Sequence, residues 1–271
     1  MEKELRKRMS TACVGGFVLV ALVVFGGLAG IFLIYLAMAL GMVFEFSQMS
    51  FSLSDRLDKR YLLLLLTWLM AFAQLIFPQI EHGIFIIAFF LLSFYFLFTA
   101  RFHAERLSIH FREWTYAFFA LFYLVYLPFY LVKLHQLGFR WVLFLFALVW
   151  SGDSASYFLG KKYGRRLLYF QISPKKTVEG ALGGWFVSEI LSLVAKFFWL
   201  KDLSWVFLMV TVTLVSFFSQ WGDLCESLMK RVFRQKDSGS WLPGHGGVWD
   251  RFDGLIFATP ILYFCVRWWS S

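Results

Sequence analysis

Long apolar stretches recur along the whole chain, and they limit the possible folds more than any other feature. A helix needs about 20 apolar residues to cross the hydrocarbon core of a bilayer. The run 12–46 is too long for one crossing and suits two that meet near Gly26–Gly27. Seven more stretches follow, at 61–78, 83–100, 114–132, 140–160, 181–200, 204–222 and 252–269. The sequence therefore predicts an all-α integral membrane protein, a polytopic bundle of about nine transmembrane helices. Eight helices remain the alternative if the first stretch crosses only once.

Composition agrees with a membrane protein. Of the 271 residues, 60% are hydrophobic and only 16% are charged, against about 45–50% and about 25% in soluble domains. One soluble core cannot bury so much apolar surface, so lipid must cover much of it. The basic N-terminus MEKELRKRMS precedes an apolar run far longer than the 7–15 residues typical of a signal peptide. We expect this run to be kept as membrane-spanning structure.

The basic residues predict the orientation of the helices. Lys and Arg accumulate in the cytoplasmic loops of membrane proteins. With the N-terminus in the cytoplasm, nine spans place the tail, 49–60, 101–113, 161–180 and 223–251 on the cytoplasmic side. Only five of the 26 Lys and Arg residues then lie elsewhere, namely Lys133, Arg140, Lys196, Lys201 and Arg267. We therefore expect a cytoplasmic N-terminus, a C-terminus on the opposite side, and no nucleic-acid partner for the net charge of +9.

Most of the unusual polar chemistry of this sequence lies in the C-terminal part of the chain. We divide the chain into N-terminal transmembrane helices, 1–140, and a C-terminal region, 141–271, which we expect to be catalytic. The two long polar loops, 161–180 and 223–251, both belong to the second region. The three cysteines have neither the spacing of a disulfide framework nor that of a zinc site. Oxygen and nitrogen groups in the two loops are thus the candidates for function.

The first half of segment 222–253 places charges on one helix face. Asp223, Glu226, Ser227, Lys230 and Arg231 follow helical spacing at the end of an apolar stretch. Two carboxylates one turn apart near a membrane boundary can bind a hard divalent cation through their oxygens. A helix end with ordinary ion pairs has the same spacing, so this interpretation stays open on spacing alone.

The second half of the segment combines glycines with further carboxylates. In Pro243–Gly247 three glycines surround His245, which lets the backbone approach a ligand and point N–H groups at phosphate oxygens. A plain turn has the same composition. Asp250 and Asp253 share the first turn of the last apolar stretch, where carboxylates also serve as helix caps. Because ionisable groups at membrane depth are costly, we expect them to meet the earlier carboxylates in a functional site.

These residues match a known family signature. Segment 227–253, SLMKRVFRQKDSGSWLPGHGGVWDRFD, resembles that of phosphatidate cytidylyltransferases: Ser, Lys-Arg, Lys-Asp, a Pro-x-His-Gly-Gly loop and Asp-Arg-x-Asp. A second block supports the resemblance, with DSASYFLG at 153–160 and SPKKTVEG at 173–180. Val178 stands where the family usually has an aromatic residue. The resemblance covers about the last 120 residues.

The resemblance implies an activity. CTP and phosphatidic acid would give CDP-diacylglycerol and pyrophosphate in phospholipid biosynthesis, through metal-assisted attack of the lipid phosphate on the α-phosphate of CTP. Mg²⁺ would be the cofactor, and a second cation could clamp the attacking and leaving oxygens. The resemblance further implies a bacterial inner (cell) membrane protein with its active site facing the cytoplasm, and it suggests a homodimer.

The resemblance also assigns roles to residues. We expect Asp223 and Asp250 to be the principal metal ligands, supported by Asp253 and Glu226. The catalytic residues would be Asp223, Asp250, Lys230 and His245. The substrate-binding residues would be Lys230, Arg231, Lys236, Asp237, Gly244, Gly246, Gly247, Arg251, Lys175, Lys176, Asp153 and Ser173.

Two other functions were weighed against this one. A CTP-dependent polyprenol or phytol kinase would use the same two kinds of substrate, but we do not expect it to carry the full signature. A secondary transporter places charges near the membrane midplane in matching halves. Here the polar residues cluster at one membrane face in the C-terminal half, which does not favour transport.

Overall fold

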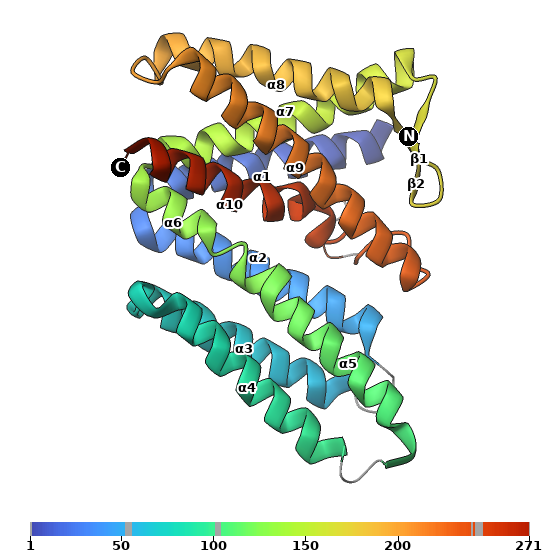
Figure 1. The fold of residues 1–271 in the computed structure, drawn as a ribbon. Coiled ribbons are helices and arrows are strands. Elements are labelled where there is room, and N and C mark those ends of the chain that lie inside the picture. Colours follow the sequence, from blue (N-terminus) through green and yellow to red (C-terminus); the bar gives the residue numbers. More distant parts are fainter. Residues whose placement is uncertain (1, 52–55, 101–103, 240, 242–245, 271) are drawn as a thin grey trace.

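The computed structural model describes residues 2–51, 56–100, 104–239, 241 and 246–270, without the side chains of 2–13, 56 and 104. Each predicted apolar stretch is helical (Figure 1). The helices are α1 (Glu2–Phe25), α2 (Gly27–Ser50), α3 (Arg56–Ile76), α4 (Glu81–Ala100), α5 (Leu107–Ala120), α6 (Tyr130–Leu137), α7 (Phe139–Tyr163), α8 (Val178–Phe198), α9 (Trp205–Val232) and α10 (Trp249–Ser270), with short 3-10 turns at Pro78–Ile80 and Ala104–Arg106.

Within the described residues, seven helical segments are long and apolar enough to cross a membrane. They are Gly27–Ser50, Leu57–Ile76, Pro78–Ala100, Leu107–Leu137, Phe139–Tyr163, Val178–Phe198 and Trp205–Val232. The apolar part of α1, Val14–Phe25, is shorter, and α10 carries charges in its first and last turns. The all-α polytopic class is confirmed, whereas nine crossings and their orientation stay predictions. The predicted division of the first stretch is correct, because α1 ends at Phe25 and α2 begins at Gly27.

The predicted span 114–132 belongs to a longer, irregular helical segment. A π-helical turn, Leu121–Tyr126, follows α5 and leads into α6. The N–H of Leu127 bonds to the carbonyl of Phe122, five residues earlier. Pro128 comes next and has no N–H to offer, so the helix cannot continue regularly through it.

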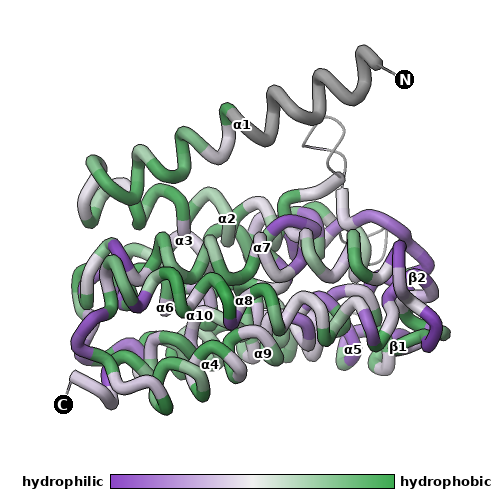
Figure 2. The backbone as a smooth tube through the Cα atoms, turned by 90° about the horizontal axis from the view of Figure 1, so that it is seen from above, coloured by the Kyte–Doolittle hydropathy of each residue, from purple (hydrophilic) through white to green (hydrophobic). Residues whose placement is uncertain are grey.

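The helices run side by side, and their connections lie at two opposite ends (Figure 1). One end holds the β1–β2 hairpin, the last turns of α4 and α9 and the first turn of α5. The C-terminus lies at the other end. Figure 2 shows that the β2 side of the hairpin is hydrophilic while the helices are mostly apolar. Strands β1 (Leu167–Tyr169) and β2 (Ser173–Thr177) pair antiparallel, with Tyr169 opposite Ser173. This hairpin is the one strand element among the described residues, and the sequence analysis predicted only a polar loop there.

The two ends of the chain share one core. Trp249, Tyr35, Tyr123 and Phe46 are among the largest fully buried side chains. The ring of Trp249 in α10 packs edge-on against Phe46 in α2, at 5.7 Å between centroids. Tyr35 Oη donates to the carbonyl of Val125, 3.1 Å away. The N-terminal helices therefore directly support the start of α10, where the signature segment lies.

Candidate active site

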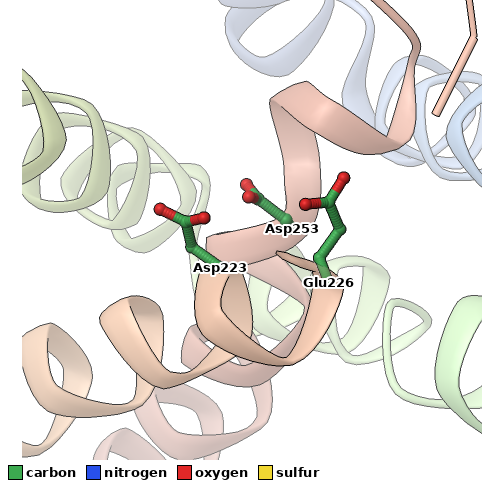
Figure 3. Close-up of side chains that lie close together, drawn as sticks. All are labelled: Asp223, Glu226 and Asp253. Atoms are coloured by element: carbon green, nitrogen blue, oxygen red, sulfur yellow. The ribbon is translucent and has the colours of Figure 1, made fainter. Parts of the chain in front are cut away.

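Three carboxylates from two helices converge at the hairpin end of the bundle. Asp223 and Glu226 project from α9, and Asp253 projects from α10 (Figure 3). One oxygen of each lies within 4.8 Å of the others. The helices can approach this closely because position 222 is glycine. A Cβ atom there would lie 2.6 Å from the carbonyl oxygen of Asp253. The structure thus brings together three of the four carboxylates that the sequence analysis expected to meet.

Glu226 makes this cluster suitable for a metal ion. Its side chain is 1% exposed, and its Oε1 atom has no hydrogen-bond partner among the described residues. A buried oxygen without a partner is costly. Carboxylate oxygens are the ligands that Mg²⁺ prefers, so a divalent cation would supply the missing partner. The three side chains therefore fit the metal that the sequence analysis expects.

Asp250 lies outside this cluster and has different partners. Lys230 lies between two carboxylates, 2.7 Å from Glu226 and 2.6 Å from Asp250. The other Asp250 oxygen, Oδ2, accepts from the backbone N–H groups of Ser238 (3.0 Å) and Gly247 (2.8 Å). Both oxygens of Asp250 are thus already engaged. Its role as a principal metal ligand stays a prediction, and the geometry favours Glu226 and Asp253 in its place.

The second polar loop reaches the same site through the hairpin. Lys176 on β2 forms an ion pair with Asp223. Arg231 at the end of α9 donates to the carbonyl of Ile172, 3.2 Å away, which ties the hairpin to α9. The Thr177 hydroxyl accepts from the N–H of Gly180 and caps α8. Segments 161–180 and 223–251 therefore meet, as the sequence analysis expects.

A cavity of about 610 Å³ opens between the hairpin and helices α7 to α9. Such a volume lies in the range of small-molecule and cofactor sites. Asp153, Ser173, Lys175 and Lys176 line it, as does Asp223 of the acidic cluster. The sequence analysis had selected all five. Lys161, Tyr157 and Gln220 also line the cavity and were not selected.

The remaining predicted residues lie around the start of α10. Lys236, Asp237 and Arg251 are exposed, and the cavity lining does not include them. Gly246 has φ +81°, and a Cβ atom there would lie 2.7 Å from Asp250. The N–H of Gly247 already donates to Asp250, so it is not free for a phosphate in this conformation. Gly244 and His245 lie outside the described residues.

Two buried residues of this network were missed. The hydroxyl of Ser238 lies 2.8 Å from Glu45 and 3.1 Å from Asp250. Glu45 in α2 also accepts from two backbone N–H groups at the start of α10. A signal was present, because Glu45 is the only charged residue in the apolar run 12–46. An isolated carboxylate in such a run is costly unless it has a specific partner.

An apolar groove of about 670 Å³ lies beside the cavity, between α8, α9 and the hairpin. It shares Leu168, Ala181 and Gln220 with the cavity, so the two spaces are adjacent. Leu182 and Phe217 line it and are 58% and 52% exposed. Both residues belong to helices that are long and apolar enough to cross a membrane, so the groove is open on an apolar helix surface.

Fold and site together define a polytopic membrane protein that has a carboxylate cluster beside a basic cavity, with an apolar groove next to that cavity. The sequence model of the cytidylyltransferase family matches residues 6–269. The chain therefore belongs to the cytidylyltransferase family.

Curated relatives are similar over part of their length. A phosphatidate cytidylyltransferase from Bacillus subtilis is 41% identical over 138 residues, which is 51% of either chain. The enzyme of the same name from Staphylococcus epidermidis is 47% identical over 128 residues, and that from Staphylococcus aureus is 46% identical over 126. The chain thus spans about half the length of the curated relatives it matches.

Proposed function

We propose that this protein transfers a cytidylyl group from CTP to phosphatidic acid and releases pyrophosphate. An oxygen of the lipid phosphate attacks the α-phosphorus of CTP, and the bond from that phosphorus to the bridging oxygen of the β-phosphate breaks. The product is CDP-diacylglycerol. The observation that carries the proposal is the position of the acidic cluster, which touches a basic cavity that lies next to an apolar groove.

The cavity suits the triphosphate of CTP. Lys161, Lys175 and Lys176 give it three positive side chains. Both substrates are anions, so fixed positive groups that hold them together reduce their repulsion and lower the barrier. Lys176 already pairs with Asp223, which joins the triphosphate site to the acidic cluster. Asp153 lies on the α7 wall of the same cavity and would orient the nucleotide.

Asp223, Glu226 and Asp253 would hold Mg²⁺ beside the reacting phosphates. The bound ion would neutralise charge on the phosphate oxygens, and a second cation would require a further ligand such as Asp250. Lys230 is 11% exposed and lies between Glu226 and Asp250. It keeps these two carboxylates at a fixed separation and balances the charge of the cluster from the α9 side.

The groove suits the acyl chains of the lipid. Phosphatidic acid would enter laterally from the bilayer with its chains along Trp185, Phe217 and Trp221. Its phosphate would then reach the cavity past Ala181 and Gln220, which both spaces share. The lipid would thus reach the site without leaving the membrane.

The orientation of the protein in the membrane follows from the distribution of its Lys and Arg residues. We propose nine crossings, with the hairpin end and the acidic cluster facing the cytoplasm of a bacterial cell, where CTP is made. Basic residues near the inner leaflet attract anionic lipid by about 1 kcal/mol each. A homodimer, suggested by the family resemblance, is part of this proposal.

Labelled CTP tests the reaction. Purified protein is given phosphatidic acid, Mg²⁺ and CTP labelled at either the α- or the γ-phosphate, and the lipid product is extracted. We expect label in lipid from the α-position only. Label from the γ-position would instead support the lipid kinase, and transport of solute into vesicles with no labelled lipid would support a transporter.

Filling the groove should affect the lipid substrate alone. We expect Leu182→Trp to raise the KM for phosphatidic acid, measured at varied surface fraction in mixed micelles, by about tenfold because the lipid is displaced from its position. The KM for CTP should stay unchanged. Leu97→Trp on α4 is the matched control, since Leu97 is 75% exposed and lies outside the groove. Equal effects of the two variants on the lipid KM would contradict this use of the groove.

A further inference from the structure

Glu45 joins the N-terminal helices to the catalytic segment. Its side chain is 2% exposed. Oε1 accepts from the N–H of Val248 at 2.7 Å, and Oε2 accepts from the N–H of Trp249 at 3.0 Å. The hydroxyl of Ser238 lies 2.8 Å from Oε2. One carboxylate in α2 thus contacts two parts of the segment that joins α9 to α10, the Ser238 hydroxyl and the backbone at the start of α10.

These contacts provide hydrogen-bond acceptors for the N–H groups at the start of α10. The first N–H groups of a helix have no partner inside it, and a negative charge at this end is favourable. In most helices the side chain of a residue close in sequence accepts hydrogen bonds from these N–H groups. Here the carboxylate comes from a helix about two hundred residues earlier in the chain. The start of α10, and with it the direction of Asp250 and Asp253, therefore depends on the position of α2.

The glycines of the signature allow the chain to wrap around this carboxylate. A Cβ atom at Gly247 would lie 2.5 Å from Oε2 of Glu45, and one at Gly239 would lie 2.5 Å from Oε1. Real Cβ atoms do not approach other atoms so closely. The second glycine of the His-Gly-Gly loop is thus explained by its closeness to Glu45 and, closer still, to the Ser238 hydroxyl.

A continuous network leads from Glu45 to the acidic cluster. The Ser238 hydroxyl lies between Glu45 and Asp250, and it can donate its single proton to only one of them at a time. Asp250 contacts Lys230, and Lys230 contacts Glu226. Glu45 itself is not among the described residues that line the cavity.

We propose that Glu45 is a positioning residue for the transfer reaction. It fixes the start of α10 and the Ser238 region, and through Asp250 and Lys230 it holds Glu226 in place for the metal ion. It touches neither substrate. The kinetic part of this inference rests on the proposed function, whereas its structural part does not.

The test compares two buried carboxylates of the N-terminal helices. Glu45→Gln keeps the size of the side chain but removes the charge and one acceptor oxygen. Glu113→Gln is the matched control, since Glu113 is likewise buried, at 1% exposed, and its ion pair is with Lys59 of α3. Both variants leave buried donors less well satisfied, so both report general destabilisation. Only Glu45→Gln should alter the site.

Two readouts are expected to separate the variants. In the wild-type protein the amides of Val248 and Trp249 should be protected from hydrogen exchange, and Glu45→Gln should make them exchange at least tenfold faster, unlike Glu113→Gln. In the lipid assay, Glu45→Gln should lower kcat by about ten- to a hundredfold, with the KM for CTP unchanged and more Mg²⁺ needed for half-maximal rate. Glu45→Asp, which keeps the charge, should recover part of the kcat.

The outcomes are distinguishable. If the wild-type protein transfers no cytidylyl group, the proposed function fails while the exchange result still tests Glu45. If Glu45→Gln and Glu113→Gln behave alike in exchange and in Mg²⁺ dependence, the positioning role is overturned. Should Glu45→Gln not fold, Ser238→Ala keeps the two backbone contacts of Glu45 and removes its link to Asp250. A wild-type kcat and Mg²⁺ dependence in Ser238→Ala would then overturn the proposed link from Glu45 through Asp250 to Glu226.

Discussion

Replacing Asp253 by Asn is expected to lower cytidylyl transfer by about a thousandfold while leaving the protein as stable as before, or more stable. The loss follows because a neutral amide is a poor metal ligand, and removing one group that stabilises transition-state charge typically costs about a hundred- to a thousandfold. The gain in stability follows because three carboxylates whose oxygens lie within 4.8 Å of one another repel. Transfer from α-labelled CTP at varied Mg²⁺ and the thermal midpoint of the same preparation measure the two effects.

Activity and thermal midpoint together distinguish a metal site from a cluster that only stabilises the fold. Asp202→Asn, at an exposed position in the connection between α8 and α9, is the control and should change neither quantity. If Asp253→Asn turns over normally with unchanged Mg²⁺ dependence, Asp253 is not a ligand. If it instead unfolds at lower temperature, the cluster holds the fold together and the metal proposal loses its main support.

Asp250→Asn is expected to reduce transfer as well, but in a different manner. The amide group would direct N–H atoms towards donors, because Asp250 accepts from Lys230 and from the backbone of Ser238 and Gly247. Lys230 would lose one of its two partners at an 11% exposed position. Removing one partner of a buried ion pair costs about 3–5 kcal/mol. We therefore expect a lower thermal midpoint and a kcat reduced by about a hundredfold, since the α9–α10 connection shifts.

The Mg²⁺ titration decides between the two roles of Asp250. If Asp250 anchors the connection, the Mg²⁺ concentration for half-maximal rate should change by less than about threefold, because the kcat effect is then separate from metal binding. If it is a principal metal ligand, as the signature implies, that concentration should rise in parallel with the rise in Asp253→Asn. The second result would overturn the anchoring role and restore the ligand set of the sequence analysis.

Much of the architecture was accessible from local sequence. Every predicted apolar stretch is a helix, and the division at Gly26–Gly27 is correct. The face that carries Asp223, Glu226 and Lys230 continues to the end of α9. These properties depend on hydropathy over about 20 residues and on a repeat of 3.6, which any window of sequence contains. The π-helical turn and the β1–β2 hairpin were not predicted, because they depend on single backbone hydrogen bonds.

The composition of the site required the tertiary structure. Spacing along the chain could not decide between Asp250 and Asp253, since both lie in the first turn of α10. The choice depends on where α9 and α10 cross, and Gly222 allows that crossing at Asp253. Likewise, Lys176 meets Asp223 because the hairpin folds back onto α9. Such contacts form only between groups that the folded chain brings within a few ångströms of each other. The sequence specifies which groups are present but not which of them become neighbours.

The apolar run 12–46 also shows that the sequence alone does not specify which residues meet in the folded chain. The apolar run 12–46 predicted by itself that α1 and α2 are apolar helices, because a soluble core cannot bury an apolar run of that length. It contains Glu45, whose cost in an apolar run was visible in the sequence. That Glu45 receives its hydrogen bonds from the start of α10 was decided only by the packing of α2 against α10, since the partners of a buried carboxylate depend on three-dimensional proximity.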